Sequence, residues 1–483
     1  MNAAAHRSAR RQGLLVASVA VAIFMARLDI SIVNISLPSI ARSFHAGTSP
    51  VAWVAMGYLL FSCGCMLVVG RVADDAGPRL LFVLGYAIFT VASLFCGLAG
   101  SLAMLIAFRC LQGIGGAVLV ILAYTVVARY LPAARVGGAM GLLATSGALG
   151  IALGSPLGGL LTEQFSWRWV FFVNVPVGVV AVVLAWHAMR GLSSGQGARE
   201  GSPARLDYAG AVLSFVAVAS LVAALSFGEE AGWASAPIVA LFALCAVTGV
   251  LFVVRQSRAA DPLVAPSLLR DRRFLLAVAT TVCGCILIGG NGFLMPFYLE
   301  LVHGLDPGQA GLVLLVYSAV FIALSPFTGR LADRHAPWRS CAAGMGVGTA
   351  ACAVFALTLG AAGLLAAVVF LAAMALAYAL FFAANGKEVL GAAPAEHKGA
   401  ASAVFGTLYT LSLLLGVTLF ETLYSQPVSG QVAAASPVAG GWQPGFSGAY
   451  VAGGVACGLA VLLSLVAARL GRRSELTAAP ELR

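Results

Sequence analysis

The sequence predicts an all-α membrane protein with fourteen transmembrane helices, and three observations carry this prediction. Hydrophobic residues make up 61% of the 483 residues and charged residues only 10%, whereas a soluble domain carries about 25% charged residues. The apolar residues gather into fourteen runs, each near the roughly 20 residues that a helix needs to cross a bilayer. Basic residues are concentrated in alternate connecting segments, as expected of loops on one side of a membrane.

Taken in chain order, the runs are separated by short polar segments whose Gly, Pro and charged residues mark loops. The first run, near 14–37, follows three Arg residues as a signal peptide would, but it has the length of a span and is expected to be an uncleaved helix. The longest polar loop is expected near 421–447. The other runs lie near 51–70, 80–99, 102–128, 137–161, 169–189, 208–227, 236–254, 274–299, 311–328, 340–360, 363–384, 401–420 and 448–468.

The distribution of Lys and Arg predicts the orientation. With the N-terminus inside, 24 of the 28 basic residues fall in inside segments, two (Arg42 and Arg168) in outside loops, and Arg27 and Arg109 within spans. We therefore expect both termini to be cytoplasmic. Because the basic residues are scattered among short loops rather than gathered in one patch, the net charge of +10 does not indicate nucleic-acid binding.

An internal repeat indicates how the spans are grouped. The segment Gly70-Arg71-Val72-Ala73-Asp74 follows the second run, and Gly329-Arg330-Leu331-Ala332-Asp333 follows the tenth. Two parallel six-helix halves with two inserted helices would place the copies in this way, with a substrate site between the halves near the midplane. We expect an N-terminal half over 1–190, a linker with two inserted helices over 191–273, and a C-terminal half over 274–483.

Three further segments carry a resemblance to a known family. Residues 28–38 read LDISIVNISLP, residues 109–115 read RCLQGIG, and residues 167–178 read WRWVFFVNVPVG. Together they resemble the fourteen-helix drug:proton antiporter branch (EmrB/QacA type) of the major facilitator superfamily. The resemblance implies the major facilitator fold and proton-driven export of small amphipathic molecules by alternating access. We also expect a monomer in the lipid bilayer of a bacterial inner membrane, with no cofactor, and the dispersed His residues predict no metal site.

Asp29 is the candidate proton carrier. A carboxylate within a span costs roughly 3 kcal/mol to insert, and burial disfavours its charged form, so that it is suited to binding and releasing a proton. The alternative is a structural carboxylate that pairs with an Arg and never titrates. Arg109, buried in the fourth run, needs partners, and Gln112 lies one turn away. The resemblance links Arg109 to proton transfer, and a structural hydrogen-bonding role is the alternative.

Arg27 is the second basic residue within the spans. It lies two positions from Asp29 and faces another side of the helix, on a stripe with Ser31 and Asn34. It is expected either to line the substrate cavity or to act on Asp29 through space. The remaining polar residues predicted to line a largely apolar cavity are Asn34, Gln112, Asn291, Tyr317 and Glu421. For Glu421, a charge at the edge of a loop remains an alternative.

Three glycine-containing segments resemble two motifs of the family. The two repeat segments resemble its conformational latch, although Asp75 and Pro78 stand where the family has basic residues. The predicted latch residues are Gly70, Asp74, Gly77, Arg79, Gly329, Arg330, Asp333 and Arg334. Residues 150–159 resemble the antiporter motif, in which small residues let helices pack closely. Its residues are Gly150, Gly154, Pro156, Gly158 and Gly159, with the Pro displaced by one position by Ser155.

Three classes of function remain open at this stage. Proton-coupled export of drugs is favoured by the motifs. Transport of one metabolite or of a self-made antibiotic, including uptake by symport, is the second class, and a non-transporting membrane receptor or enzyme is the third. No nucleotide-binding G-x-x-x-x-G-K-[ST] segment occurs, which argues against an ATP-driven pump.

Overall fold

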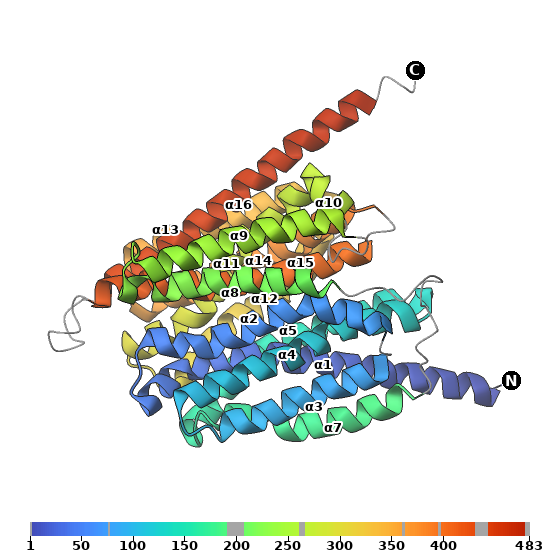
Figure 1. Ribbon diagram of the computed structural model, residues 1–483, viewed down its shortest axis with the longest axis horizontal. Helices are drawn as coiled ribbons and strands as arrows, with labels where there is room; N and C mark the ends of the chain where they lie inside the picture. The colour runs from blue at the N-terminus through green and yellow to red at the C-terminus, as the bar shows by residue number, and fades with distance from the viewer. Residues whose placement is uncertain are drawn as a thin grey trace. The chain divides into compact units, whose positions relative to one another are not determined.

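The computed structural model describes residues 2–75, 78–190, 207–259, 266–359, 363–394, 398–429 and 443–478. Within these ranges the chain forms sixteen helices and no strand (Figure 1). Fourteen helical segments in the same ranges are long and apolar enough to cross a membrane. The predicted all-α architecture with fourteen spans is therefore confirmed.

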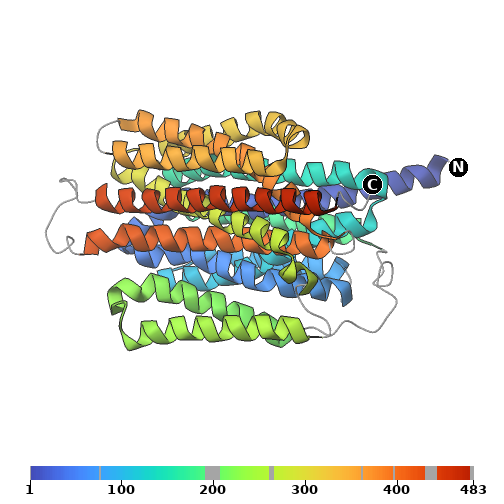
Figure 2. The same ribbon diagram turned by 90° about the horizontal axis from the view of Figure 1, so that it is seen from above.

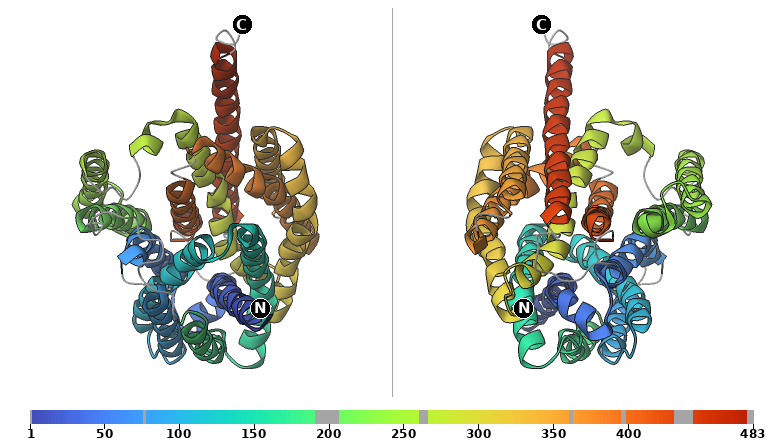
Figure 3. Two further views of the ribbon diagram at one scale, coloured as in Figure 1. Left: turned by 90° about the vertical axis from the view of Figure 1, so that its right-hand side faces the viewer. Right: turned by 90° about the vertical axis from the view of Figure 1, so that its left-hand side faces the viewer.

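The chain forms two compact units, of which the first comprises Met1–Ala219, Ala259–Leu263 and Gly304–Leu315. Seven helices lie in it entirely: α1 (Asn2–Phe44), α2 (Thr48–Asp75), α3 (Pro78–Gly97), α4 (Leu102–Tyr130), α5 (Ala133–Gln164), α6 (Trp169–Phe172) and α7 (Asn174–Ala188). Figure 3, which looks along the helices, shows the blue-to-cyan helices end-on as one bundle.

The second unit comprises Ser220–Arg258, Val264–His303 and Val316–Arg483. Helices α8 (Tyr208–Ala231) and α12 (Pro307–Arg334) contribute residues to both units. The other helices of the second unit are α9 (Ala236–Arg258), α10 (Pro266–Arg270), α11 (Arg272–Leu301), α13 (Pro337–Thr358), α14 (Gly363–Ala392), α15 (Lys398–Ser429) and α16 (Gln443–Ala478).

Several helices extend beyond the apolar runs that predicted them. The first begins at Asn2 rather than near residue 14, and α15 continues to Ser429. The predicted loop over 421–447 is therefore wrong at both ends, because 421–429 and 443–447 are helical. Apolar length predicts the part of a helix that lies in hydrocarbon, but the backbone hydrogen bonds of a helix continue through polar residues at the membrane surface.

The sixth span is divided into two helices. The short α6 ends at Phe172, and α7 begins at Asn174. Pro176 explains the break, since it has no N–H to donate to the carbonyl oxygen of Phe172, four residues earlier. The break places the side chain of Asn174 at the first turn of α7, where it is 1% exposed.

Small residues of α5 let this helix pack closely on α1. A Cβ atom added at Gly150 would lie 2.6 Å from the backbone oxygen of Phe24 on α1, and one added at Gly158 would lie 2.6 Å from the Ile35 Cγ2 atom. One added at Gly154 would overlap the Cβ of Ser31. Three of the predicted antiporter-motif glycines thus seat α5 on α1, the pair of helices with the most extensive contact.

The second unit has an aromatic core. Tyr450 of α16 lies edge-on to Phe355, Phe370 and Phe420, with ring centroids 4.8, 5.2 and 5.6 Å away. Helices α8 and α9 lie side by side as a hairpin (Figure 2). Of all the spans in the described ranges, α9 is the most exposed, as expected of a helix that faces lipid.

Candidate functional site

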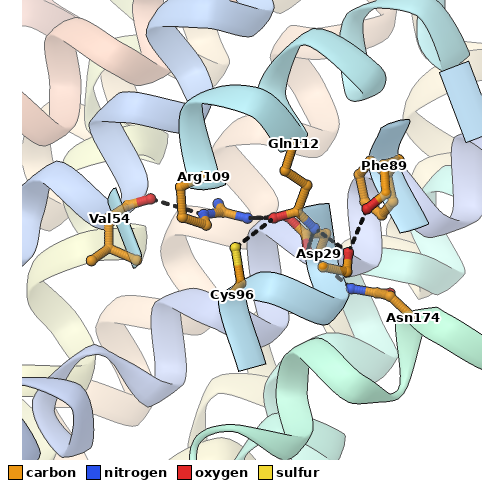
Figure 4. A network of polar contacts seen from close by, with 8 residues as sticks. Asp29, Val54, Phe89, Cys96, Arg109, Gln112 and Asn174 are labelled. Carbon is orange, nitrogen blue, oxygen red and sulfur yellow. Dashed lines mark hydrogen bonds and ion pairs between the residues drawn. The ribbon is translucent and has the colours of Figure 1, made fainter. Parts of the chain in front are cut away.

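Asp29 and Arg109 form a buried ion pair in the first unit. The Arg109 Nη1 atom lies 2.6 Å from the Asp29 Oδ2 atom, and the two side chains are 2% and 0% exposed. Asp29 comes from α1 and Arg109 from α4 (Figure 4). The pair joins two residues that the sequence singled out separately.

Gln112 completes the pair from one turn further along α4. Its Nε2 group donates to Asp29 Oδ1 at 2.8 Å and to the Ser93 hydroxyl at 2.7 Å. Its Oε1 atom accepts a hydrogen bond from Arg109 Nη1 at 2.7 Å. The Ser93 hydroxyl in turn donates to the carbonyl oxygen of Phe89 at 2.8 Å. Gln112 was predicted to line the substrate cavity, but it is fully buried and belongs to this network.

Asn174 brings a third segment to the same carboxylate. Its Nδ2 group donates to Asp29 Oδ1 at 3.0 Å from the start of α7 (Figure 4). Asp29 thus accepts three hydrogen bonds, from Arg109, Gln112 and Asn174. Hydrogen bonds to an ionised group are about twice as strong as those between neutral groups, so this arrangement suits a negatively charged Asp29.

Arg109 is held in place by α2 as well. Its Nε atom donates to the carbonyl oxygen of Val54 at 2.9 Å, and its guanidinium carbon lies 4.4 Å from the ring centroid of Tyr58. A guanidinium over an aromatic face is stabilised by a cation–π interaction. The planar group is therefore fixed by a backbone acceptor, a ring and a carboxylate.

Glycines of α4 let the neighbouring helices approach the network. A Cβ atom at Gly115 would lie 2.7 Å from the backbone nitrogen of Phe89 on α3, and one at Gly113 would overlap the backbone oxygen of Tyr58 on α2. Side chains at these positions would separate α4 from α2 and α3. The segment RCLQGIG thus supplies both the polar groups and the close packing that the network needs.

The chemistry of the site follows from its charge balance. One negative and one positive group neutralise each other, and within the described residues all three donors converge on one carboxylate. A proton added to Asp29 would leave the Arg109 charge buried without its partner, a situation that costs about 3–5 kcal/mol in proteins. The buried charge of each residue therefore depends on the presence of the other.

The other predicted cavity residues of the first unit are Arg27 and Asn34, which lie on the same helix as Asp29. Arg27 and Asn34 are half-buried on α1. The Arg27 side chain lies beside α5, since a Cβ at Gly150 would be 3.2 Å from the Arg27 Cβ.

The predicted latch is only partly within the described residues. Gly77 and the side chains over 70–78, with that of Asp333, lie outside the described part of the chain, and so does the predicted pairing of Asp74. The guanidinium carbon of Arg79 lies 3.6 Å from the ring centroid of Trp186. Arg330 and Arg334 are exposed, and a Cβ at Gly329 would meet open space.

The predicted cavity residues of the second unit are Asn291, Tyr317 and Glu421. Asn291 Oδ1 accepts a hydrogen bond from the Tyr450 hydroxyl at 3.0 Å. Tyr317 is half-buried and stacks against Phe321, with ring centroids 6.1 Å apart. Glu421 lies inside α15 and is 1% exposed, so the alternative of a loop-edge charge is wrong. A cavity shared with residues of the first unit stays a prediction.

Three residues of the network were not singled out by the sequence. Ser93 and Tyr58 look like ordinary residues of apolar spans. Asn174 carried a signal, because it is an Asn within an apolar run and falls in the segment 167–178 that resembles the family. The sequence could not show that this amide reaches a carboxylate 145 residues earlier in the chain.

Comparison with known proteins identifies the family. The family model of the Major Facilitator Superfamily matches residues 19–417. The chain belongs to the Major Facilitator Superfamily. This facilitator is therefore a multi-pass membrane transporter by family, and its buried Asp29–Arg109 pair is a charged site within a transporter fold.

Several relatives of this facilitator are named for drug resistance. It is 33% identical to the multidrug resistance protein Stp of Mycobacterium tuberculosis over 67% of this chain and 60% of Stp. It is 31% identical to the multidrug transporter MdtP of Bacillus subtilis over 66% of this chain and 58% of MdtP. The riboflavin transporter RibZ of Clostridioides difficile is 26% identical over 87% of this chain and 90% of RibZ. The match to Stp and MdtP thus spans less than two thirds of their length.

Solved structures show the same fold. A bacterial homologue of the human lysosomal transporter Spinster, in an inward-facing and occupied conformation, matches 95% of this chain and 97% of its own with a TM-score of 0.68 and 16% identity. The transporter PepTSo matches 96% of this chain and 98% of its own, with a TM-score of 0.69 and 15% identity. At such low identity these likenesses show the fold alone.

Proposed function

We propose that this facilitator is a proton-coupled exporter of small amphipathic or lipophilic compounds, and that Asp29 carries the proton. The observation that carries the proposal is the buried Asp29–Arg109 pair with its surrounding amides. In this proposal a proton and Arg109 compete for the same carboxylate. The ion-paired arrangement is the proton-free form.

Competition couples the proton to a change of conformation. When Asp29 is ionised, Arg109 is neutralised in place and the first unit stays closed around the pair. When a proton binds, Arg109 keeps its charge, because a guanidinium does not deprotonate in proteins. The uncompensated charge is then stabilised by any state that exposes Arg109 to water. Arg109 is thus the switch that senses the proton, and Asp29 is the carrier.

The energies are of matching size. Leaving one member of a buried ion pair without its partner costs about 3–5 kcal/mol. Moving one proton inward through a membrane potential of about 150 mV supplies about 3.5 kcal/mol, on the basis of roughly 2.3 kcal/mol per 100 mV. One proton per cycle therefore supplies a free energy comparable to the cost of the broken pair.

The choice of drug export rests on the relatives. Stp and MdtP are named as multidrug proteins, and the antiporter-type glycines that seat α5 on α1 fit the same branch. An inner-membrane location with both termini cytoplasmic, a monomeric state and antiport rather than symport belong to the same proposal. A second candidate, transport of one specific metabolite, is favoured by RibZ, which the chain matches over 90% of its length.

A resistance screen separates these candidates. A host that lacks its own drug pumps would express this chain or its Asp29→Asn variant and be exposed to a panel of dyes, antibiotics and cationic detergents. We expect raised tolerance to several unrelated compounds with the natural chain and none with the variant. Tolerance to a single compound would favour a specific transporter, and equal tolerance with the variant would contradict the role of Asp29.

A further inference from the structure

The hydrogen bonds around Asp29 include one amide that is free to change direction. We propose that Asn174 is a positioning residue whose side-chain amide donates to Asp29 when that carboxylate is ionised and turns over to accept from it when it is protonated. This inference rests on the proposed function, because it assumes that Asp29 takes up a proton. It adds a role to a residue on α7 and links that helix to the proton.

The added proton can occupy only one of the two carboxylate oxygens without a clash of donors. Oδ2 faces the Arg109 guanidinium at 2.6 Å, and the fixed positive group would oppose a proton there. Oδ1 faces two neutral amides, those of Gln112 and Asn174. A carboxylic acid has one O–H donor that needs an acceptor, so one of these amides must present its oxygen.

Gln112 is locked in its present direction. Its Oε1 atom accepts from Arg109 at 2.7 Å, and its Nε2 group donates to Ser93 at 2.7 Å. Turning the amide over would place its NH₂ group against the Arg109 guanidinium, donor against donor. It would also require Ser93 to give up its hydrogen bond to the Phe89 carbonyl oxygen. As long as Arg109 is still in place, as it is when the proton first binds, it therefore fixes Gln112 as a donor to Asp29.

Asn174 carries no such restraint. Its bond to Asp29 at 3.0 Å is the one hydrogen bond that its side chain makes within the described residues. A half-turn of the amide exchanges Nδ2 for Oδ1 at the same place, so the donor to a carboxylate becomes an acceptor for a carboxylic acid. The proton stays on Asp29 throughout, and only hydrogen bonds change partners.

Because Asn174 lies at the start of α7, the rotation of its side-chain amide changes the contact between α1 and α7. The residue opens α7 directly after the break at Val173, where the backbone is divided between two helices. A hydrogen bond to the charged carboxylate is about twice as strong as one between neutral groups. Protonation of Asp29 therefore loosens the link between α1 and α7, while Arg109 loses its partner on the other side of the carboxylate.

Infrared titration of the purified full-length chain in detergent tests the inference without a substrate. Protonated carboxyl groups have their own absorption band. The part of this band that is present in the natural chain and missing from Asp29→Asn measures the protonated fraction of Asp29. In Asn174→Leu, a residue of similar shape that neither donates nor accepts, the stronger charge-assisted bond is lost. We expect the midpoint of the Asp29 band to move to higher pH by about half to one pH unit. A hydroxyl both donates and accepts, so in Asn174→Thr the midpoint is expected to return most of the way to that of the natural chain.

The control is Ser36→Ala on the same helix as Asp29. The Ser36 hydroxyl bonds to Thr162 at 2.8 Å, away from the network, and its loss is expected to leave the midpoint unchanged. An Asn174→Leu midpoint equal to that of the natural chain would overturn this inference alone. An Asp29 band that never appears on acidification would overturn the proposed function and this inference together. A role of Asn174 in packing alone predicts changes in yield or stability with no shift in the midpoint.

Discussion

The buried pair predicts a strong energetic coupling between Asp29 and Arg109. Asp29→Asn keeps the shape of the side chain and an acceptor oxygen, but it leaves the Arg109 charge at 2% exposure without a counter-charge. Arg109→Gln leaves the carboxylate with Gln112 and Asn174 as donors but without a positive partner. The double variant Asp29→Asn/Arg109→Gln removes both charges and leaves a neutral polar cluster.

The size of the effect follows from the burial of both groups. Removing one member of a buried pair costs about 3–5 kcal/mol of unfolding free energy, whereas replacing both is often nearly neutral. Each single variant is therefore expected to lose about 3 kcal/mol, and the double variant about 1 kcal/mol. The resulting interaction energy, the departure from additivity, is about 5 kcal/mol, above the 0.5–3 kcal/mol that is usual for contacting residues.

The assay is equilibrium unfolding in mixed micelles at neutral pH, applied to the four members of the cycle. Arg135→Gln serves as the matched control, because Arg135 is exposed and its guanidinium donates to Gln12, outside the network around Asp29. Its effect on the free energy of unfolding is expected to stay within about 0.5 kcal/mol. Single losses that simply add up in the double variant would refute the reasoning, since they would show that neither charge depends on the other.

Three further predictions concern the packing of α5, the shape of the Arg109 side chain and the titration of His303. Gly154→Ala would force its Cβ into Ser31 and is expected to cost about 1–3 kcal/mol of unfolding free energy. The Cβ of Gly141→Ala on the same helix meets open space, so this variant is expected to be neutral or stabilising. Equal melting temperatures of the two variants would contradict the packing role of Gly154. Arg109→Lys keeps the charge but loses the planar guanidinium that bonds both to the α2 backbone and to Asp29 on α1. Transport is therefore expected to fall at least tenfold in a vesicle assay. A normal rate would show that the site needs only the positive charge of residue 109. Burial lowers the pKa of His303, which lies beyond the end of α11, so the folded state binds a proton there less readily than the unfolded state. The stability that is present above about pH 6.5 is therefore lost as the pH falls below that value. His303→Phe is expected to flatten the dependence of melting temperature on pH between 7 and 5, and an unchanged slope would show that other groups cause this dependence.

The fold was predictable because apolar length is a strong signal in lipid. Each of the fourteen spans is a run of residues that has no stable alternative to a helix in hydrocarbon. The ends of the helices were less predictable, as α15 shows by continuing to Ser429 through polar residues. The break before Asn174 could have been found from Pro176, since a missing N–H is a local property of the sequence.

The site was predictable in its members but not in its geometry. Asp29 and Arg109 stood out because charges within spans are rare and need partners. Helical periodicity gives the side of a helix on which a residue lies, but it does not say which other helix that side meets. For this reason the sequence predicts a cavity position for Gln112 and no role for Asn174, although both amides bond to the same oxygen of Asp29.

Measuring the release of protons during uptake of a transported compound tests the central claim most directly. Proteoliposomes with an acidic interior and an internal pH dye would receive, from outside, a compound identified by the resistance screen. If a proton and Arg109 compete for Asp29, the compound should enter as protons leave, and Asp29→Asn should stop proton loss while unlabelled compound still exchanges for labelled compound. Proton loss of the same size in Asp29→Asn, or uptake that is indifferent to a collapsed pH gradient, would contradict the account.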